Sequence, residues 1–434
     1  MTAPAEVAQG EPNWANETMW TGDNLPIMRG MNSGSVDLIY LDPPFNSKAN
    51  YAAPIGSQAA GAEFKDTWTL QDIDVAWLDL IEQKHPQVNR IVHAAMTDSD
   101  KSYLVYMAAR LIEMHRLLRP TGSIYLHCDP TMSHYLKLLM DAIWGRTQFR
   151  NEIVWCYRGM TPKSTRFNAK HDALLYYTAG NNAVFNHQKG TPTPESLKTY
   201  QSAQSRGYNA NHARMMVVVF DRSKYQAAVD RGDIPKGMRE SEFDGGAPWL
   251  SDWWADIKIL GGPSNRERTG YPTQKPLALL ARIIRASSNE GDVVLDPFAG
   301  CATACVAAHE HGRQWAGIDV SSKAFDLVRQ RIEDRGGLFY NLVHREDVPK
   351  RTDLGPIPPY NAPENKTRLY GEQGGQCAGC EVWFRPENLT IDHIIARSVG
   401  GTDHLGNLQL LCGNCNSIKG NRGMEYLVAR LRRD

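Results

Sequence analysis

The chain has 434 residues, of which 42% are hydrophobic and 22% charged, and Lys plus Arg balance Asp plus Glu at 48 each. This composition is typical of a globular protein with two or three domains. Eight cysteines are too few for a disulfide scaffold, and no apolar run is long enough to cross a bilayer. The first residues carry neither a basic start nor an apolar segment, so we expect a cytoplasmic protein with no membrane partner.

The first informative stretch is the apolar run of residues 36–41, VDLIYL. Its β-branched and aromatic residues predict a strand in a sheet that is covered on both faces. Asp42, Pro43, Pro44 and Phe45 follow directly. Neither proline can donate to a β-ladder, and each restricts the residue before it, so the pair predicts an abrupt strand end and a stiff loop.

This loop has the groups needed to hold an exocyclic amine. The carboxylate of Asp42 and the loop carbonyls can accept hydrogen bonds from the amine, and the ring of Phe45 offers a plane on which a base can stack. An Asp-Pro turn between a strand and a helix is also common without any such function. The tetrapeptide by itself leaves both interpretations open.

The next segments repeat an α/β pattern. Residues 103–118 have apolar positions at helical spacing and end at an Arg-Pro-Thr-Gly turn, and SIYLHC (123–128) is typical of a strand. Residues 135–144 predict a second amphipathic helix, and NEIVWCY (151–157) predicts a second strand. The first part of the chain therefore indicates an α/β sheet.

Residues 157–270 interrupt this pattern. Basic and aromatic residues are interleaved there, and residues 151–275 hold 17 Lys or Arg against 12 Asp or Glu, a net charge of +5. Such an insert suits a surface that reads base edges on a polyanion. An irregular lobe with an aromatic core would have the same pattern.

Regularity returns after residue 270. PTQKP (272–276) precedes an amphipathic helix, the strand VVLD ends in DPFAG (296–300), and a further helix leads to the strand QWAGIDV with Asp319 at its tip. This βαβ unit has a small-residue turn after its first strand and an acid after its second, which lets backbone approach a nucleoside while the acid binds ribose hydroxyls. An ordinary βα turn remains the alternative.

Three motifs in this order resemble those of the β-group DNA amino-methyltransferases, in which the catalytic motif precedes the cofactor motif. The motifs are LDPPFN (41–46), PTQKP (272–276) and DPFAG (296–300), and the resemblance runs from about residue 22 to residue 332. It implies a Rossmann-like sheet that binds S-adenosylmethionine. The cofactor residues that it implies are Asp296, Phe298 and Gly300 in the pocket, Asp319 on the ribose, Thr273 and Lys275 near the methionine end, and Asp23 as an assisting acid.

Two positions depart from the family pattern. Cys301 and Ala302 stand where the family mostly has small Ser or Gly residues. Ala302 has less backbone freedom than glycine, so affinity for the cofactor is the property in doubt.

The resemblance also implies a mechanism. The target base is flipped out and stacks on Phe45, while the Asp42 side chain and the Pro43 carbonyl accept hydrogen bonds from its amine as the nitrogen attacks the sulfonium methyl. Pro44 keeps the loop rigid. Serine is common at the first position in the cytosine branch, so the aspartate favours adenine.

The C-terminal part begins after a Pro-rich linker at residues 346–369. Cys377, Cys380, Cys412 and Cys415 form two CxxC pairs with 31 residues between them, a spacing that predicts a four-thiolate structural zinc site. A metal would also stabilise a domain too small for a large core.

Residues 370–423 resemble the HNH (ββα-metal) endonucleases. The resemblance implies that His393 is the general base that activates water, that Asp392 and Asn416 ligate a catalytic Mg²⁺ or Mn²⁺, and that Asn407 orients His393 or supports its loop. A zinc-stapled module that binds DNA without cleaving it is the alternative.

The expected fold is α/β: a Rossmann-like S-adenosylmethionine-dependent methyltransferase sheet with an irregular target-recognition insert, plus a small zinc-stapled HNH domain. The predicted domains are residues 1–156 (catalytic half of the methyltransferase), 157–270 (target recognition), 271–345 (cofactor-binding half), 346–369 (linker) and 370–434 (HNH-like zinc domain).

The expected partner is double-stranded DNA, with a homodimer as a possibility. One chain that methylates and cuts DNA would suit restriction-modification or a phage or mobile-element role. The alternative is an orphan adenine or cytosine-N4 methyltransferase whose C-terminal domain only grips DNA.

Overall fold

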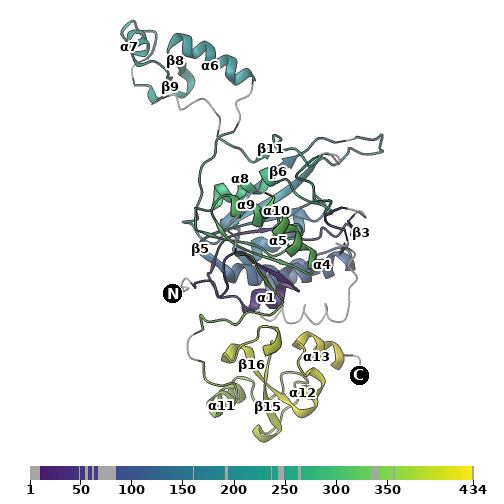
Figure 1. The fold of residues 1–434 in the computed structure, drawn as a ribbon. Coiled ribbons are helices and arrows are strands. Elements are labelled where there is room, and N and C mark those ends of the chain that lie inside the picture. Colours follow the sequence, from purple (N-terminus) through teal and green to yellow (C-terminus); the bar gives the residue numbers. More distant parts are fainter. Residues whose placement is uncertain are drawn as a thin grey trace. The chain divides into compact units, whose positions relative to one another are not determined.

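The structure is a computed structural model that describes residues 10–47, 49–53, 57–60, 63–66, 85–159, 161–190, 194–235, 237–242, 249–261, 265–334, 341–354 and 357–432. The chain divides into two compact units, Met1–Asn186 with Asp252–Asp434, and His187–Ser251 (Figure 1). Each unit is described by itself. In the described part of the chain, no helix has both the length and the apolar character that a membrane crossing needs.

The first unit contains a mixed sheet in which nine of the described strands pair in the order β11-β6-β7-β5-β2-β12-β13-β1-β14. All neighbours from β5 to β14 are parallel, whereas β7 runs antiparallel to β5 and β6. The strands are β1 (Thr18–Thr21), β2 (Val36–Leu41), β5 (Leu118–Cys128), β6 (Phe149–Cys156), β7 (His171–Thr178), β11 (Trp253–Trp254), β12 (Val293–Asp296), β13 (Gln314–Asp319) and β14 (Val343–Arg345). A separate antiparallel pair joins β3 (Ala49–Ala52) to β4 (Glu63–Asp66).

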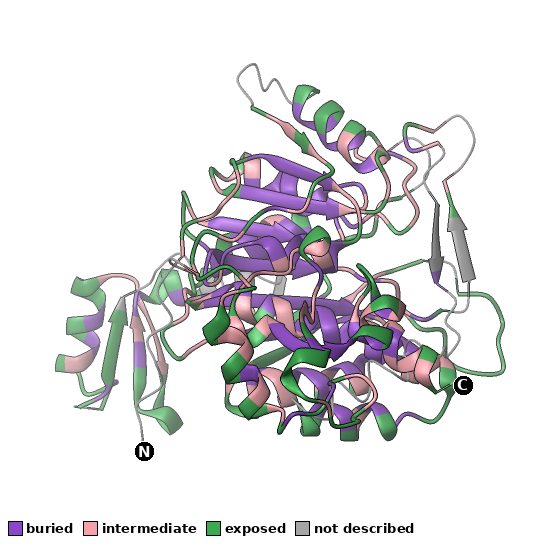
Figure 2. Cartoon of the chain, turned by 90° about the horizontal axis from the view of Figure 1, so that it is seen from below, coloured by how far each residue is buried: buried purple, intermediate pink, exposed green. Residues whose placement is uncertain are grey.

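Helices cover both faces of this sheet. On one face lie α1 (Asn24–Gly30), α3 (Pro86–His93), α4 (Asp98–Leu117) and α5 (Ser133–Trp144), and on the other lie α8 (Leu277–Ser287), α9 (Thr303–Glu310) and α10 (Lys323–Glu333). The short 3-10 helix η1 (Arg146–Gln148) leads into β6. Buried strands (purple) therefore lie between helices whose outer faces are exposed (Figure 2).

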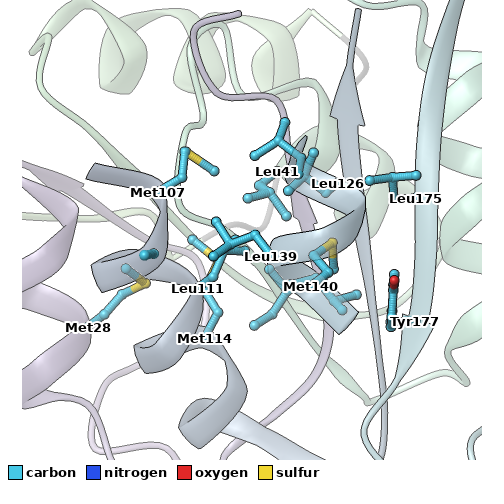
Figure 3. Close-up of a cluster of buried hydrophobic side chains, with 14 of the residues drawn as sticks. Met28, Leu41, Met107, Leu111, Met114, Leu126, Leu139, Met140, Leu175 and Tyr177 are labelled. Carbon is cyan, nitrogen blue, oxygen red and sulfur yellow. The ribbon is translucent and has the colours of Figure 1, made fainter. Parts of the chain in front are cut away.

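The residues of β2 explain its central place. All six are buried; Ile39 and Leu41 pack in one hydrophobic cluster, and Leu38 and Tyr40 pack in the other. Figure 3 shows the first cluster, which includes Leu41 of β2, Leu111 of α4 and Leu139 of α5. The prediction of a strand covered on both faces is confirmed, because alternate side chains enter opposite cores.

One element differs from the sequence-based expectation. β7 lies inside residues 157–270, for which an irregular insert was predicted, and its residues from Ala173 to Thr178 are all buried in the main sheet. A short apolar run between basic residues is compatible with a buried strand or an irregular lobe, and only pairing with β5 and β6 distinguishes them.

The unit His187–Ser251 has a small core of its own. Its described strands β8 (Tyr208–Asn211), β9 (Met216–Val219) and β10 (Arg239–Glu242) form a sheet of order β10-β9-β8, accompanied by α6 (Pro194–Arg206), η2 (His212–Arg214) and α7 (Arg222–Asp230). Val217, Tyr225 and Ile234 are among the residues buried in this core. The assignment of residues 157–270 to target recognition stays a prediction.

The C-terminal residues have another core. The antiparallel pair β15 (Leu389–His393) and β16 (Leu408–Cys412) packs with α11 (Pro363–Glu372), α12 (Gly413–Lys419) and α13 (Met424–Leu431). Three 3-10 helices, η3 (Pro386–Asn388), η4 (Arg397–Val399) and η5 (Leu405–Asn407), shape the connections. The expected order of two strands followed by a helix is present, and the apolar cluster includes Leu389, Leu410 and Leu427.

Candidate active site

A cavity of about 740 Å³ opens at the carboxyl ends of β2, β12 and β13. These strands are parallel neighbours, so the loops that follow them meet at one edge of the sheet. The predicted residues that line the cavity are Asp23, Asp42, Pro43, Pro44, Phe45, Thr273, Lys275, Asp296, Phe298, Gly300 and Asp319. The structure thus brings together the three motifs and Asp23, although their individual roles stay predictions.

The two oxygens of the Asp42 carboxylate have different surroundings. Oδ2 accepts a hydrogen bond from Nζ of Lys275 at 2.6 Å, and both side chains are largely buried. Oδ1 is buried and has no hydrogen-bond partner in the described structure. A buried acceptor without a donor is unfavourable by about 1–3 kcal/mol, so this oxygen is suited to accept from a ligand.

Lys275 also lies beside the aromatic ring of the motif. Its Nζ is 5.1 Å from the centroid of the Phe45 ring, within the range of a cation–π contact. The sequence motif implied a role for Lys275 near the cofactor, but its ammonium group contacts Asp42. A base stacked on Phe45 would therefore lie next to this ammonium group.

The loop after β2 is held by hydrogen bonds to Asp66, a residue that the sequence analysis did not identify. The carboxylate of Asp66 accepts hydrogen bonds from the backbone N–H groups of Phe45, Asn46 and Ser47 at 3.2, 2.7 and 2.8 Å. Asn46 has a positive φ of 58° and donates through Nδ2 to Oδ1 of Asp100. These bonds hold the loop in one conformation, and no local pattern connects Asp66 with it.

The second loop approaches the cavity through its backbone. Gly300 has a φ of 53°, and a Cβ there would lie 3.0 Å from the ring of Tyr271, so the position requires glycine. Ala302 also adopts the left-handed conformation, with a φ of 54°, at the N-cap of α9. The departure noted in the sequence therefore falls on a position where a Cβ is unfavourable, by about 1–2 kcal/mol.

Two acids flank this loop: Asp296 is buried and Asp319 is partly buried. Burial raises the pKa of Asp296 well above its usual value, and the charges of Asp42 and Asp319 act in the same direction. Burial also raises the pKa of Asp319 to about 6, although its carboxylate accepts from the N–H groups of Gly300 and Ser321. The cavity therefore carries clustered acidic groups whose ionisation depends on what binds there.

Arg110 of α4 is a second residue that sequence reasoning missed. Its Nη2 donates to Oδ1 of Asp23 at 2.8 Å, its Nε donates to Asn24, and its guanidinium group lies 3.4 Å from the centroid of the Tyr106 ring. Asp23 uses the same oxygen to cap α1. Arg110 is nearly buried and lines the cavity, so it fixes the acid that the sequence predicted near the cofactor.

The C-terminal cysteines meet as their spacing predicts. The sulfur atoms of Cys377, Cys380, Cys412 and Cys415 all lie within 4.8 Å of one another. In a tetrahedral Zn–thiolate site with bonds of about 2.3 Å, the sulfurs lie about 3.8 Å apart. The residues therefore fit a structural zinc ion.

The HNH motif residues lie around β15. Nε2 of His393 is 2.8 Å from Oδ1 of Asp403, a partner that the sequence analysis did not identify. Oδ2 of Asp392 accepts from Nζ of Lys419 and from Gln409. Asn407 makes three hydrogen bonds to the backbone of the loop 395–402, which it supports.

The side chain of Asn416 contacts β15 at a residue other than Asp392. Its Nδ2 donates to the hydroxyl of Thr390, two residues before Asp392 on β15. Joint ligation of a metal by Asp392 and Asn416 stays a prediction.

Comparison with known proteins agrees with both parts of the chain. The family model described as DNA methylase matches residues 36–330, and the model described as HNH endonuclease matches residues 377–422. A type II methyltransferase, M.EcaI from Enterobacter cloacae, is 28% identical over 347 residues, which cover 73% of this chain and 69% of that protein. The DNA adenine methyltransferase YhdJ from Escherichia coli K12 is 24% identical over 73% of this chain and 83% of its own length.

Other similar proteins extend this picture. The chain covers 48% of the Mod subunit of the type III restriction-modification enzyme StyLTI from Salmonella typhimurium, with 25% identity over 65% of this chain. A solved M1.HpyAVI–SAM complex has 18% identity and a TM-score of 0.39, and the match covers 73% of this chain and 98% of that one.

Proposed function

The chain belongs to the DNA methylase family, with an HNH domain at its C-terminal side, and from this premise we propose that it methylates the exocyclic amine of a base in double-stranded DNA. The methyl donor is S-adenosylmethionine. The observation that carries the proposal is the buried Oδ1 of Asp42, which has no hydrogen-bond partner in the described structure, on a residue that lines the cavity together with Phe45 and the Gly300 loop. An amine N–H is the complement of that oxygen.

The cavity residues suit the donor. The positive φ of Gly300 lets the backbone come close to a nucleoside, and a side chain there would meet Tyr271. Asp319 lies at the tip of the strand after this loop, where an acid can accept from ribose hydroxyls. We assign Asp296 and Phe298 to the same nucleoside pocket, and Asp23 and Thr273 to its rim.

S-adenosylmethionine supplies, when bound, a methyl group made electrophilic by a sulfonium. The residues of this chain then position the amine. Phe45 stacks against the flipped base, and Oδ1 of Asp42 and the Pro43 carbonyl accept its hydrogens, which directs the nitrogen lone pair toward the methyl group. Once methylated, the amine nitrogen would carry a surplus proton, which Oδ1 of Asp42 would accept and pass to water, while the demethylated donor would leave as a neutral thioether.

Lys275 and Asp66 support this arrangement from two sides. The ammonium group of Lys275 holds Oδ2 of Asp42, which leaves Oδ1 as the oxygen without a hydrogen bond. Asp66 fixes the backbone of Phe45 and its neighbours. Catalysis is therefore chiefly positioning and electrostatics, with no covalent enzyme intermediate.

We propose adenine N6 as the acceptor. The aspartate at the first motif position supports it, and a relative is described as a DNA adenine methyltransferase. Cytosine N4 is the alternative, because it offers an exocyclic amine to the same acceptors.

We further propose that the HNH domain nicks or cleaves DNA with Mg²⁺ or Mn²⁺. His393 would activate water, and the contact of its Nε2 with Asp403 supports a fixed ring orientation. A role in restriction-modification or in a phage or mobile element follows from joining both activities. The alternative is a zinc-stapled domain that only binds DNA, and a homodimer is compatible with either.

The methyltransferase proposal is tested with labelled S-adenosylmethionine and duplex DNA. The wild-type protein should transfer label to DNA, Asp42→Ala should abolish transfer, and hydrolysis followed by chromatography should give N6-methyladenine. Asp347→Ala, which breaks an exposed ion pair with Arg345, is the matched control and should keep full activity. Normal transfer by Asp42→Ala would contradict the site, and N4-methylcytosine would select the alternative base.

The nuclease proposal needs a separate assay. Supercoiled plasmid without methylation should be nicked in the presence of Mg²⁺ or Mn²⁺, and His393→Ala should remove nicking while zinc content stays unchanged. Retention of nicking in that variant would point to a contaminating nuclease. If neither metal supports cleavage by the wild-type protein, the DNA-binding alternative is correct.

A further inference from the structure

A series of side-chain hydrogen bonds links Tyr40, His127, Asp172 and Tyr157 close to the catalytic loop. Nε2 of His127 is 3.0 Å from Oδ2 of Asp172, and Nδ1 of the same ring is 2.9 Å from the hydroxyl of Tyr40. Tyr157 donates to the other oxygen of Asp172 at 3.0 Å. His127 is completely buried, so its ring nitrogens exchange no hydrogen bonds with solvent.

These residues come from neighbouring strands of the main sheet. Tyr40 belongs to β2, His127 to β5 and Asp172 to β7, in the spatial order β7-β5-β2. Tyr157 follows β6 directly. This row of hydrogen bonds therefore crosses the sheet to β2, the strand that Asp42 directly follows.

The carboxylate of Asp172 determines which atom donates in each hydrogen bond of His127. Burial acts to raise the pKa of Asp172, but the hydrogen bond from His127, the charge of Lys275 and the hydrogen bond from Tyr157 act against it, and the pKa of Asp172 is lowered. An ionised carboxylate only accepts, so Nε2 of His127 carries a hydrogen. When the ring carries this single hydrogen, Nδ1 accepts from the hydroxyl of Tyr40.

The imidazole ring touches the catalytic aromatic residue directly. The rings of His127 and Phe45 are stacked, with centroids 6.0 Å apart and an interplanar angle of 23°, and Trp155 meets His127 edge-on. Rotation of the imidazole would break its bonds to Tyr40 and Asp172 and would disturb this stack. The orientation of Phe45 therefore depends on the histidine.

Tyr40 is the second residue, after Phe45, that both contacts His127 and lines the cavity. It lines the cavity, and its hydroxyl is influenced by the charges of Asp42 and Asp296, the acids at the ends of β2 and β12. Burial raises the pKa of Tyr40 well above its usual value, so the hydroxyl keeps its hydrogen and can donate it to His127.

We propose that Asp172 and His127 are a positioning pair for methyl transfer: the carboxylate fixes the imidazole, and the imidazole holds the ring of Phe45 by stacking and the hydroxyl of Tyr40 by a hydrogen bond. This inference rests on the proposed methyltransferase function. Neither residue touches the base or the donor. Their effect reaches the reaction through Phe45 and Tyr40.

The sharpest test is Asp172→Asn, which keeps the shape but replaces one acceptor oxygen by an N–H donor. Donation from that amide to Nε2 places the ring hydrogen on Nδ1 and reverses the bond to Tyr40. We expect kcat to fall by about ten- to a hundredfold, because small errors in positioning reduce the rate that much. Dissociation constants for the donor and for DNA, measured by calorimetry and by anisotropy, should change by less than about threefold, since the pair contacts neither ligand.

A matched control separates positioning from folding. His309 and Glu17 form another largely buried histidine–carboxylate pair, 2.9 Å apart, which does not line the cavity. Glu17→Gln should keep kcat even where its melting temperature falls as much as that of Asp172→Asn. An equal loss of kcat in both variants, or loss of donor binding in Asp172→Asn, would mean a structural role and overturn the proposal.

A double-mutant cycle identifies the path of the effect. Tyr40→Phe removes the hydroxyl, so Asp172→Asn in that background should lower kcat by clearly less than in the wild-type protein. Fully additive effects, or an unchanged kcat in Asp172→Asn, would overturn the inference while an inactive Asp42→Ala still supported the methyltransferase function. Absence of methyl transfer by the wild-type protein would overturn both.

Discussion

Lys275 and Asp42 are 233 residues apart in the chain, and Nζ of the lysine lies 2.6 Å from Oδ2 of the carboxylate. This ion pair joins the loop after β2 to the segment before α8. It leaves Oδ1 of Asp42 as the oxygen without a partner. The PTQKP motif therefore contacts the carboxylate of Asp42, for which we propose the role of binding the amine.

Replacement of the lysine tests this ion pair. Lys275→Met keeps much of the side-chain volume but leaves the carboxylate of Asp42 largely buried without its cation. We expect the free energy of unfolding to fall by about 1–3 kcal/mol and kcat to fall at least about tenfold. Urea unfolding and steady-state methyl transfer measure these changes. Lys323→Met, which breaks an exposed pair with Asp326, is the control, and similar results for both lysines would contradict the prediction.

Asp66 should control the catalytic loop. Asp66→Ala removes the acceptor of three backbone N–H groups, and Asp66→Asn keeps one acceptor oxygen. We expect kcat to fall by about a hundredfold in the alanine variant and by less in the asparagine variant, because the loop loses its preferred conformation. Affinity for the donor, measured by calorimetry, should stay close to that of the wild-type protein. A uniform loss of donor affinity in both variants would argue against a specific effect on the loop.

Donor binding should depend on the ionisation of Asp319. Burial raises the pKa of this group to about 6, so most molecules carry the neutral acid at pH 5 and the carboxylate at pH 7. A carboxylate accepts from ribose hydroxyls better than the acid does, and we therefore expect donor affinity to rise between pH 5 and pH 7. Calorimetric titrations across this range check it. Asp319→Asn should flatten the profile, and a flat profile in the wild-type protein would refute the assignment.

Donor affinity should rise with pH, whereas the contribution of Asp319 to the stability of the ligand-free protein should fall as the pH rises. The folded protein binds the Asp319 proton more tightly than the unfolded chain does, so this group contributes stability below about pH 4 that is lost as pH rises toward 6. The shift corresponds to about 3 kcal/mol. The difference in unfolding free energy between wild-type protein and Asp319→Asn should therefore depend on pH in this window.

Zinc removal should act on the C-terminal part. The four cysteines lie in or beside its apolar core, and apparent zinc affinities of about 10–16 kcal/mol are typical of such small sites. Cys415→Ser should lose the metal, measured by atomic emission, and residues 357–432 should become sensitive to protease. Methyl transfer should persist. Full protease resistance without metal would show that the apolar core suffices.

Local patterns in the sequence predicted much of the fold. Six apolar residues followed by Pro43 and Pro44 predicted a buried strand and its end, and β2 spans Val36–Leu41. The strand and helix around DPFAG were predicted from the same kind of local signal, as were the two CxxC pairs that bring four sulfurs together. Strand β7 was missed because a short apolar run among basic residues has no distinctive period.

By itself, the sequence determined many of the strands, helices and stiff loops, because apolar spacing, prolines and glycines act over a few residues. Only the tertiary structure decided which side chains meet. The contacts of Asp42 with Lys275, of Phe45 with Asp66 and of His127 with Asp172 depend on the sheet order β7-β5-β2-β12 and on loops distant in the chain. Such pairings are set by packing of the whole sheet, so no local spacing encodes them.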